Sequence, residues 1–320
     1  MQRNCSVGRY VSIMGDPWNF LVVRALFFRI RRFEEIQRSL GVSRRLLADR
    51  LRRLVDLTII VRNRYQRRPE RFEYRLTPKG FDLYASLAAQ MHWGDRWLSG
   101  KKGPPLLLRH LTCGNRLTPI AVCSKCGGEI DPHAVSYRDG PGAGMSSARG
   151  DVRSRRTSNP EIYERGRACS AARALKIMGN KWAYLVLREA FFGVRRFEEF
   201  HRRLGIARNI LADRLEGLVA NGVLERRRSV RSPDRLEYRL TAMGLDFYPA
   251  VLAMMQWGDR WLAGKAGPPL RLIHLACGKV FMPVIVCSAC REEIDPKAVS
   301  YRDGVGAFGA GLRDPRKRKR

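Results

Sequence analysis

The first hundred residues carry apolar side chains at the spacing of amphipathic helices. One such stripe consists of Trp18, Leu21, Val22 and Ala25. A short helix is expected over 33–40 and a longer one from about Arg44 to Val55, because apolar residues recur there three or four positions apart. A turn at 41–43 joins the two, and Ser43 is suited to cap the second helix. Two short helices joined by a tight turn, the second with a basic outer face, are typical of a helix-turn-helix.

Two runs rich in β-forming residues follow, at 59–65 and 72–76. They flank a charged stretch that contains Pro69, which predicts a hairpin with a basic tip. Such a hairpin after a helix-turn-helix is the wing of a winged helix. A long helix is expected from Pro78 to about Leu98, because proline is favoured in a first helical turn. The predicted fold class is mainly α with small β-hairpins, an α+β arrangement.

The whole pattern occurs twice along the chain. A shift of 164 residues places Cys5 on Cys169, RRFEE at 31–35 on 195–199, and WGDRWL at 93–98 on 257–262. The match runs from 5–140 to 169–304, and more than half of its positions are identical. We interpret this as a tandem duplication, since each copy is long enough to form a domain.

The duplication sets the expected domain boundaries. Each copy is expected to form a winged helix-turn-helix domain, at 5–100 and 163–264, followed by a small zinc-knuckle module, at 101–140 and 265–304. Residues 141–162 are rich in Gly, Ser and Arg and predict a flexible linker. Residues 305–320 predict a basic disordered tail.

These motifs resemble the HxlR-type winged helix-turn-helix regulators, which are relatives of the MarR group. The resemblance rests on the early Cys, Gly-x-x-Trp at 15–18, RRFEE, EYRLTPKG at 73–80 and the terminal Trp-Gly-x-x-Trp. It implies a homodimeric DNA-binding transcription factor, a repressor rather than an activator, that reads pseudo-palindromic operators. In this tandem chain the alternative to a homodimer is an intrachain pseudo-dimer, in which the two copies pair with each other. The chain departs from the family in its tandem form and in Ala207, which stands where copy one has the capping residue Ser43.

Charge supports a nucleic-acid partner. The chain has 320 residues and a formal net charge of +31, with 45% hydrophobic residues, so it can bury a core while attracting a polyanion. An anionic membrane surface is the weaker alternative. No apolar run reaches the ~18 residues of a membrane span, and the N-terminus lacks the apolar stretch of a signal peptide. We therefore expect a cytoplasmic, nucleoid-associated protein that acts on double-stranded DNA.

Exposed residues of the predicted recognition helices and wings are the candidate DNA contacts. Copy one supplies Ser43, Arg44, Arg45, Asp49, Arg52, Arg64, Arg67, Arg68 and Arg71. Copy two supplies Arg208, Asn209, Asp213, Arg228, Arg231 and Arg235. Arg suits bidentate contact with guanine and Asn suits adenine, so the copies are expected to read unequal half-sites. The alternative for each of these arginines is a solvated surface charge.

Six of the eight cysteines, with two histidines, have metal-ligand spacing. Each copy contains His-x2-Cys followed by Cys-x2-Cys, which predicts one closed, structural Cys3His zinc site in each copy. The residues are His110, Cys113, Cys123 and Cys126 in copy one, and His274, Cys277, Cys287 and Cys290 in copy two. The alternative is a set of reduced, unligated thiols.

The remaining cysteines, Cys5 and Cys169, lie near the start of a predicted first helix. A helix N-terminus and a nearby Arg9 or Arg173 would favour thiolate, so these thiols are candidates for sensing oxidants or electrophiles; the alternative is a small interface residue. No catalytic pattern is present: a zinc deaminase would need His-x-Glu upstream of Pro-Cys-x-x-Cys. The competing functions are therefore a sequence-specific regulator, an architectural DNA-binding protein and a thiol-based sensor.

Overall fold

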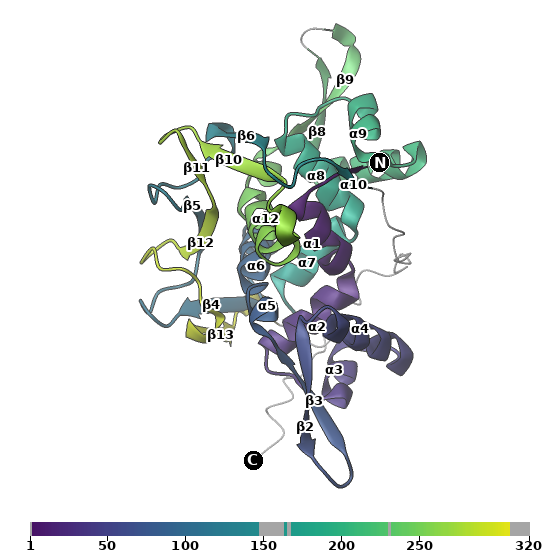
Figure 1. Cartoon of the computed structure of the whole chain (residues 1–320), viewed down its shortest axis with the longest axis vertical. Helices are drawn as coiled ribbons and strands as arrows, with labels where there is room; N and C mark the ends of the chain where they lie inside the picture. Colours follow the sequence, from purple (N-terminus) through teal and green to yellow (C-terminus); the bar gives the residue numbers. More distant parts are fainter. Residues whose placement is uncertain (1, 147–162, 165–167, 230–231, 308–320) are drawn as a thin grey trace. The chain divides into compact units, whose positions relative to one another are not determined.

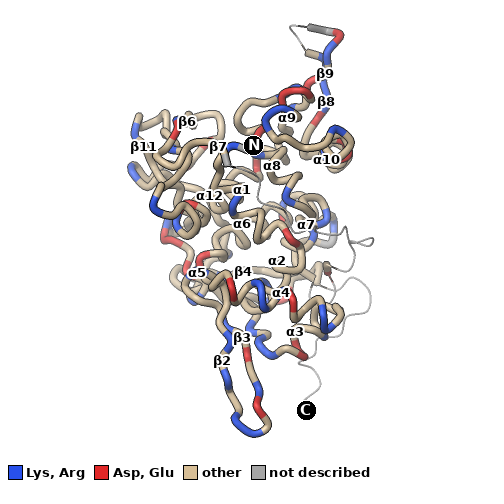
Figure 2. Tube along the Cα trace, turned by 45° about the vertical axis from the view of Figure 1, so that its right-hand side comes forward, with Lys and Arg blue, Asp and Glu red and all other residues tan. Residues whose placement is uncertain are grey.

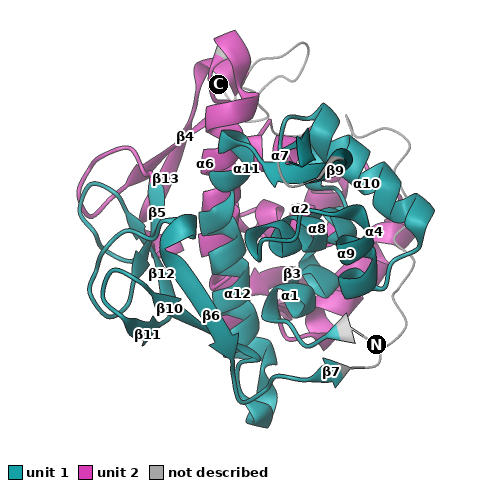
Figure 3. Ribbon diagram, turned by 90° about the horizontal axis from the view of Figure 1, so that it is seen from above, with its two compact units in different colours: residues 1–17, 119–156, 177–293 teal, residues 18–118, 157–176, 294–320 magenta. Residues whose placement is uncertain are grey.

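The computed structural model describes residues 2–146, 163–164, 168–229 and 232–307 (Figure 1). Residues 147–162 of the predicted linker and 308–320 of the predicted tail lie outside this part. The chain forms two compact units: unit 1 comprises 1–17, 119–156 and 177–293, and unit 2 comprises 18–118, 157–176 and 294–320 (Figure 3). The units do not coincide with the two sequence copies, because each unit contains segments of both.

Unit 2 contains the winged helix of copy one. Its elements are α2 (Pro17–Phe27, all but its first residue), α3 (Phe33–Leu40), α4 (Arg44–Asp56), β2 (Ile60–Gln66), β3 (Arg71–Leu76), α5 (Pro78–Phe81) and α6 (Tyr84–Leu98). The stripe Leu47, Leu51 and Leu54 of α4 is buried, as its periodicity predicted. The hairpin β2–β3 projects beyond the helices of its unit (Figure 1). The helix-turn-helix and the wing are therefore confirmed.

The predicted long helix from Pro78 is wrong at its start, because a break at 82–83 separates α5 from α6. A Cβ atom at Gly80 would lie 2.2 Å from the carbonyl oxygen of Ile59, so the short α5 is pressed against the start of the wing. Thr77 caps α5 by accepting a hydrogen bond from the Gly80 amide at 3.2 Å, and its own hydroxyl donates to the carbonyl of Thr58. These contacts orient α5 separately from α6.

Unit 1 contains the winged helix of copy two. Its elements are α8 (Lys181–Phe191), α9 (Phe197–Leu204), α10 (Arg208–Ala220), β8 (Leu224–Ser229), β9 (Ser232–Leu240), α11 (Ala242–Leu245) and α12 (Tyr248–Leu262). The order of elements repeats that of copy one, and Leu211, Leu215 and Leu218 of α10 are buried. Among the described residues, no helix is both long and apolar enough to cross a membrane.

The first helix of each copy packs in the unit that holds the other copy's winged helix. Helix α1 (Ser6–Met14) of copy one lies against α12 and α8 of copy two within unit 1. Correspondingly, residues 170–176 of α7 (Ser170–Met178), from copy two, belong to unit 2 with α6. The copies therefore exchange their N-terminal helices within one chain.

The exchanged N-terminal helix packs against the Trp-Gly-Asp motif of the long helix in its unit. In unit 1 a Cβ atom at Gly258 would lie 2.3 Å from the carbonyl oxygen of Ser6, so glycine permits the close approach. The hydroxyl of Ser6 donates to the Asp259 carboxylate, and Tyr10 packs edge-on against Trp257 with ring centroids 5.6 Å apart. In unit 2 the Ser170 hydroxyl donates to Asp95 in the same way.

Burial in these contacts predicts an unusual pH dependence. Desolvation raises the pKa of Asp259 to about 6, although the hydrogen bond from Ser6 and the charge of Arg9 lower it; burial likewise raises the pKa of Asp95 to about 6. The folded chain holds these protons more tightly than the unfolded chain, whose aspartates titrate near pH 4. The contribution of each protonated carboxyl group to the free energy of unfolding is therefore lost as the pH rises from about 4 to 6.

The double variant Asp95→Asn/Asp259→Asn keeps the oxygen acceptors and removes both titrations. At pH 7 we expect it to be more stable than the wild type by about 1–3 kcal/mol for each carboxylate, since an ionised group no longer has to be buried. Urea unfolding at pH 4.5 and 7.5 checks this. If the difference in unfolding free energy between the two proteins is the same at both pH values, the assignment is wrong.

The segments that follow the winged helices also pair across the copies. Unit 2 contains β4 (Leu106–His110) of copy one antiparallel to β13 (Val299–Asp303) of copy two. Unit 1 contains β5 (Pro119–Cys123) beside β12 (Pro283–Cys287), and β6 (Val135–Asp139) beside β10 (Leu270–His274), which also pairs with β11 (Lys279–Phe281). Strand β1 (Gln2–Arg3) pairs with β7 (Met145–Ser146). Short 3-10 helices occupy Gly100–Lys102, Pro132–Ala134, Gly264–Ala266, Pro296–Ala298 and Val305–Ala307.

Candidate nucleic-acid interface and metal centre

Helix α4 presents a basic first turn in unit 2. Ser43 caps it by accepting a hydrogen bond from the Leu46 amide at 3.3 Å, as its sequence position predicted. Arg44 and Arg45 are both exposed. Arg44 lies over the Phe33 ring and 3.7 Å from the Glu34 carboxylate, whereas Arg45 forms no ion pair with any residue that the structure describes. Arg45 is thus the guanidinium of this turn that is available to a ligand.

Helix α10 presents a different first turn in unit 1. Ala207 makes no side-chain cap, as expected. Arg208 donates two hydrogen bonds of 2.7 Å to the Glu198 carboxylate of α9, so its guanidinium group is already paired within the protein. Asn209 is exposed beside it. The partner Glu198 was missed by sequence reasoning; its signal is a carboxylate in the first turn of the preceding helix, ten residues before the arginine.

Further along the recognition helices, the candidate acidic residues pair with neighbouring arginines. Asp49 lies 3.9 Å from Arg52, and Asp213 lies 3.2 Å from Arg214. Both aspartates are exposed. Copy two has Glu216 where copy one has Arg52, so the outer face of α10 is less basic than that of α4.

The wing of copy one carries most of its arginines at and near its tip (Figure 2). Arg64 lies 3.4 Å from Glu70, and Arg62 stacks over the Phe72 ring at 3.4 Å. The exposed candidates nearest the turn are Arg67, Arg68 and Arg71. In the wing of copy two, Arg228 and Arg235 are exposed, and Arg231 lies outside the described residues. Exposed arginines on a hairpin of this kind are suited to phosphate contacts.

Four metal-ligand side chains converge in unit 1, and they come from both copies. The group consists of Cys123, Cys126, His274 and Cys277, with all ligand atoms within 4.8 Å of one another. The predicted grouping of Cys123 and Cys126 with His110 and Cys113 of the same copy is therefore wrong. The pairing of β5 with β12 and of β6 with β10 brings these ligands together, whereas His110 and Cys113 belong to unit 2.

The geometry of this group fits a tetrahedral zinc ion. Two thiolates on one zinc ion lie about 3.8 Å apart, given Zn–S bonds of ~2.3 Å. The Sγ atoms of Cys123 and Cys277 are 4.0 Å apart, and Cys126 Sγ is 3.3 Å from His274 Nδ1. Each pair lies on a tight turn completed by glycine: Gly127 donates to the Cys123 carbonyl and Gly278 to the His274 carbonyl, both with positive φ. Zinc fits this donor set because thiolate and imidazole are its preferred ligands.

Cys5 and Cys169 cap the exchanged helices. Cys5 accepts a hydrogen bond from the Gly8 amide at 3.4 Å in unit 1. Cys169 is fully buried in unit 2, and this burial raises the pKa of its thiol although the Arg24 guanidinium lowers it. A raised thiol pKa favours the neutral form over the thiolate, and sensing at Cys169 stays a prediction. Sensing at the half-buried Cys5 stays a prediction.

The fold and this arrangement of basic side chains define a winged helix-turn-helix protein of the DNA-binding class. The profile of the HxlR-like helix-turn-helix family matches twice, at residues 13–102 and 177–266. The chain belongs to this family, and its tandem duplication is confirmed. Together with the relatives named below, which are HTH-type transcriptional regulators, this supports a DNA-binding transcription regulator.

Relatives align with about one copy of the repeat. An uncharacterized HTH-type transcriptional regulator of Mycobacterium tuberculosis is 45% identical over 137 residues, which cover 43% of this chain and 87% of the relative. Another, from Synechocystis, is 37% identical over 101 residues, covering 31% of this chain and 75% of its own. A solved structure, that of PA1607, is 42% identical, covers 30% of this chain and 66% of that one, and has a TM-score of 0.29.

Proposed function

We propose that the protein is a sequence-specific transcriptional repressor that reads a pseudo-palindromic operator with two unequal half-sites. The observation that carries this proposal is the contrast between the two recognition helices. Arg45 of α4 is exposed and forms no ion pair within the described residues, whereas its counterpart in copy two is Asn209, next to an arginine held by Glu198. One chain thus supplies two readers with different base preferences, guanine for Arg45 and adenine for Asn209.

Pairing with Glu198 lowers the free energy that Arg208 can contribute to DNA binding. To contact a base or a phosphate, Arg208 must first give up two charge-assisted hydrogen bonds, which are stronger than neutral ones. Arg45 has no such cost. The DNA contribution of copy one is therefore expected to depend on arginine, and that of copy two on Asn209 and the wing.

The test compares Arg45→Ala with Arg208→Ala on an operator selected from genomic fragments at about 150 mM salt, near physiological ionic strength. We expect Arg45→Ala to weaken binding about ten- to hundredfold, since a bidentate guanine contact is worth about 1–3 kcal/mol, and to relax base preference at one position of one half-site. Arg208→Ala is expected to change the affinity less than about threefold, because its guanidinium is already occupied by the two hydrogen bonds to Glu198.

Uniform recovery of genomic fragments in the selection would contradict the proposal and favour an architectural DNA-binding protein. Equal losses for the two arginine variants would contradict the division of labour between the copies. Repression rather than activation is checked separately, by the direction in which a reporter gene behind the selected operator changes when the protein is expressed.

We further infer that the protein binds structural zinc, two ions per chain. One ion is assigned to Cys123, Cys126, His274 and Cys277. The second is expected from the remaining Cys and His residues of the duplicated sequence pattern. All four ligand positions in the unit 1 group are protein side chains, so the ion would have no open position for chemistry and would act by joining two strand turns. A small appendage with little core of its own gains most from such a link.

A further inference from the structure

Unit 1 contains a pocket that the DNA-binding role does not use. It has an empty volume of about 760 Å³, counted to its open mouth, and lies between the start of α1, helices α8 and α12, and strands β6 and β10. Its apolar wall includes Val7, Val135, Phe191, Val251, Leu252 and Met255. A mainly apolar pocket with a few polar groups in its wall is typical of a small-molecule site.

Arg188 of α8 lies in the wall of this pocket and is almost completely buried. Its guanidinium pairs with the neighbouring Glu189 and with the Cys5 side chain, yet its Nε atom has no hydrogen-bond partner among the described residues. Buried donors are nearly always paired, so an unpartnered guanidinium N–H in the wall of a cavity is available to an acceptor on a ligand. A negatively charged acceptor suits it best, because charge-assisted hydrogen bonds are the stronger ones.

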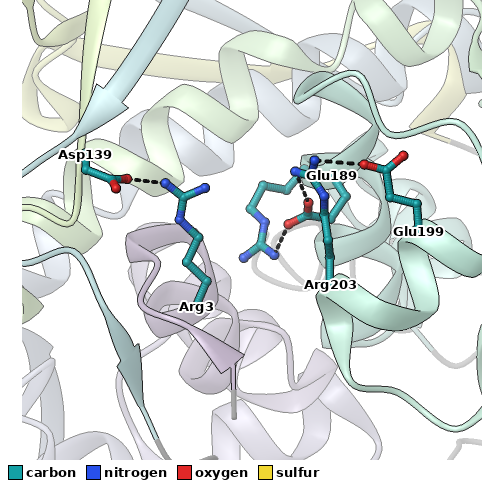
Figure 4. A network of polar contacts seen from close by, with 6 residues as sticks. Arg3, Asp139, Glu189, Glu199 and Arg203 are labelled. Carbon is teal, nitrogen blue, oxygen red and sulfur yellow. Dashed lines mark hydrogen bonds and ion pairs between the residues drawn. The ribbon is translucent and has the colours of Figure 1, made fainter.

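The charges around the pocket favour a singly negative ligand. Its charged lining residues are Arg3, Arg188 and Glu189, with a net charge of +1. Glu189 is shared with Arg203 at 3.5 Å, and Arg203 in turn pairs with Glu199 at 2.8 Å (Figure 4). Arg3 pairs with Asp139, and both side chains are exposed to solvent, so this ion pair is weak and Arg3 can turn to a ligand.

We propose that this pocket binds a small monocarboxylate with an aromatic or branched apolar body. The carboxylate lies toward Arg188 and Arg3, and the body lies against α12 and the β6–β10 strands. Such a ligand touches Val7 and Val135 of copy one as well as Phe191 and Leu252 of copy two, so it stabilises the docking of the exchanged segments in this unit. The binding proposal stands apart from the DNA-binding one, because it is measured without DNA.

Isothermal titration of the full-length, zinc-loaded protein tests the proposal with two probes of one shape, 1-naphthoate and 1-naphthamide. We expect the carboxylate to bind at least tenfold more tightly than the neutral amide. Absence of naphthoate binding at millimolar concentration would overturn the proposal. Equal affinity for the two probes would overturn the assignment of Arg188 and Arg3 as a carboxylate site.

A matched pair of variants locates the binding. Val135 is a half-buried residue of β6 in the pocket wall, and its repeat counterpart Val299 is a half-buried residue of β13 in unit 2. Val135→Trp is expected to fill the pocket and weaken naphthoate binding at least tenfold, while Val299→Trp leaves this site unchanged. If Val135→Trp binds naphthoate as the wild type does, with an unchanged circular dichroism spectrum, the ligand lies elsewhere and the proposal fails.

Discussion

Two double variants of the metal ligands are expected to lose different numbers of zinc ions. Because Cys123 and Cys277 lie in one group, Cys123→Ser/Cys277→Ser should lose one ion per chain and retain the other. Cys113→Ser/Cys123→Ser should lose both, since it removes one thiolate from each proposed site. Zinc content after dialysis against a chelator, measured by atomic emission, gives the result directly.

The opposite outcome would restore the grouping within each copy. In that arrangement Cys113 and Cys123 would share one ion, so their double variant would lose one and Cys123→Ser/Cys277→Ser would lose two. His133→Asn is the matched control, because His133 is an exposed histidine of the same appended segment and lies outside the group. It should retain both ions.

Loss of the ion should also destabilise unit 1 strongly. Structural zinc contributes apparent binding free energies of about 10–16 kcal/mol in zinc-finger peptides at pH 7, part of which becomes folding free energy here. The ion joins turns from two copies, so the apo protein is expected to lose the pairing of β5 with β12 before its winged helices unfold. Hydrogen exchange at the β5 and β12 amides, with and without chelator, checks this order; equal protection in both states would contradict it.

The second large effect is expected at Gly258, where the exchanged helix α1 meets α12. In Gly258→Ala the new Cβ would lie 2.3 Å from the carbonyl oxygen of Ser6, a backbone atom that cannot turn away. Helix α1 would have to move outward, which weakens the Ser6–Asp259 hydrogen bond and the Tyr10–Trp257 contact. We expect a loss of about 1–3 kcal/mol in the free energy of unfolding, as for other overpacked cores, measured by urea denaturation.

Gly217→Ala is the control for this variant. Gly217 is also a helical glycine of copy two, but a Cβ there would have no neighbour within 4 Å. Alanine should therefore stabilise α10 by about 0.5–1 kcal/mol through its higher helix propensity. If the two variants change stability in the same direction, the close approach of α1 to α12 is not what requires glycine at position 258.

Local patterns in the sequence predicted the winged helices well. Helix α3, which is followed by Gly41, has the predicted bounds, and α4, which is capped by Ser43, ends one residue beyond the prediction. A buried apolar stripe and a capping residue are local signals, so the sequence alone could show them. Spacing alone also marked Cys123, Cys126, His274 and Cys277, which the structure brings together as possible metal ligands. In contrast, the break between α5 and α6 depends on how Gly80 meets Ile59, a contact between segments that no local pattern records.

The sequence by itself determined that the chain contains two winged helix-turn-helix copies with a basic reading face, and which residue types can bind zinc. Only the tertiary structure decided which copy supplies the partner strand, the docking helix and the metal-ligand side chains at each position. The copies are more than half identical, so β5 could pair with a strand of either copy and Ser6 could meet either Trp-Gly-Asp motif with similar local energies. Packing within each unit selects the exchanged arrangement, and this is why Cys123 meets His274 and Cys277 rather than His110 and Cys113.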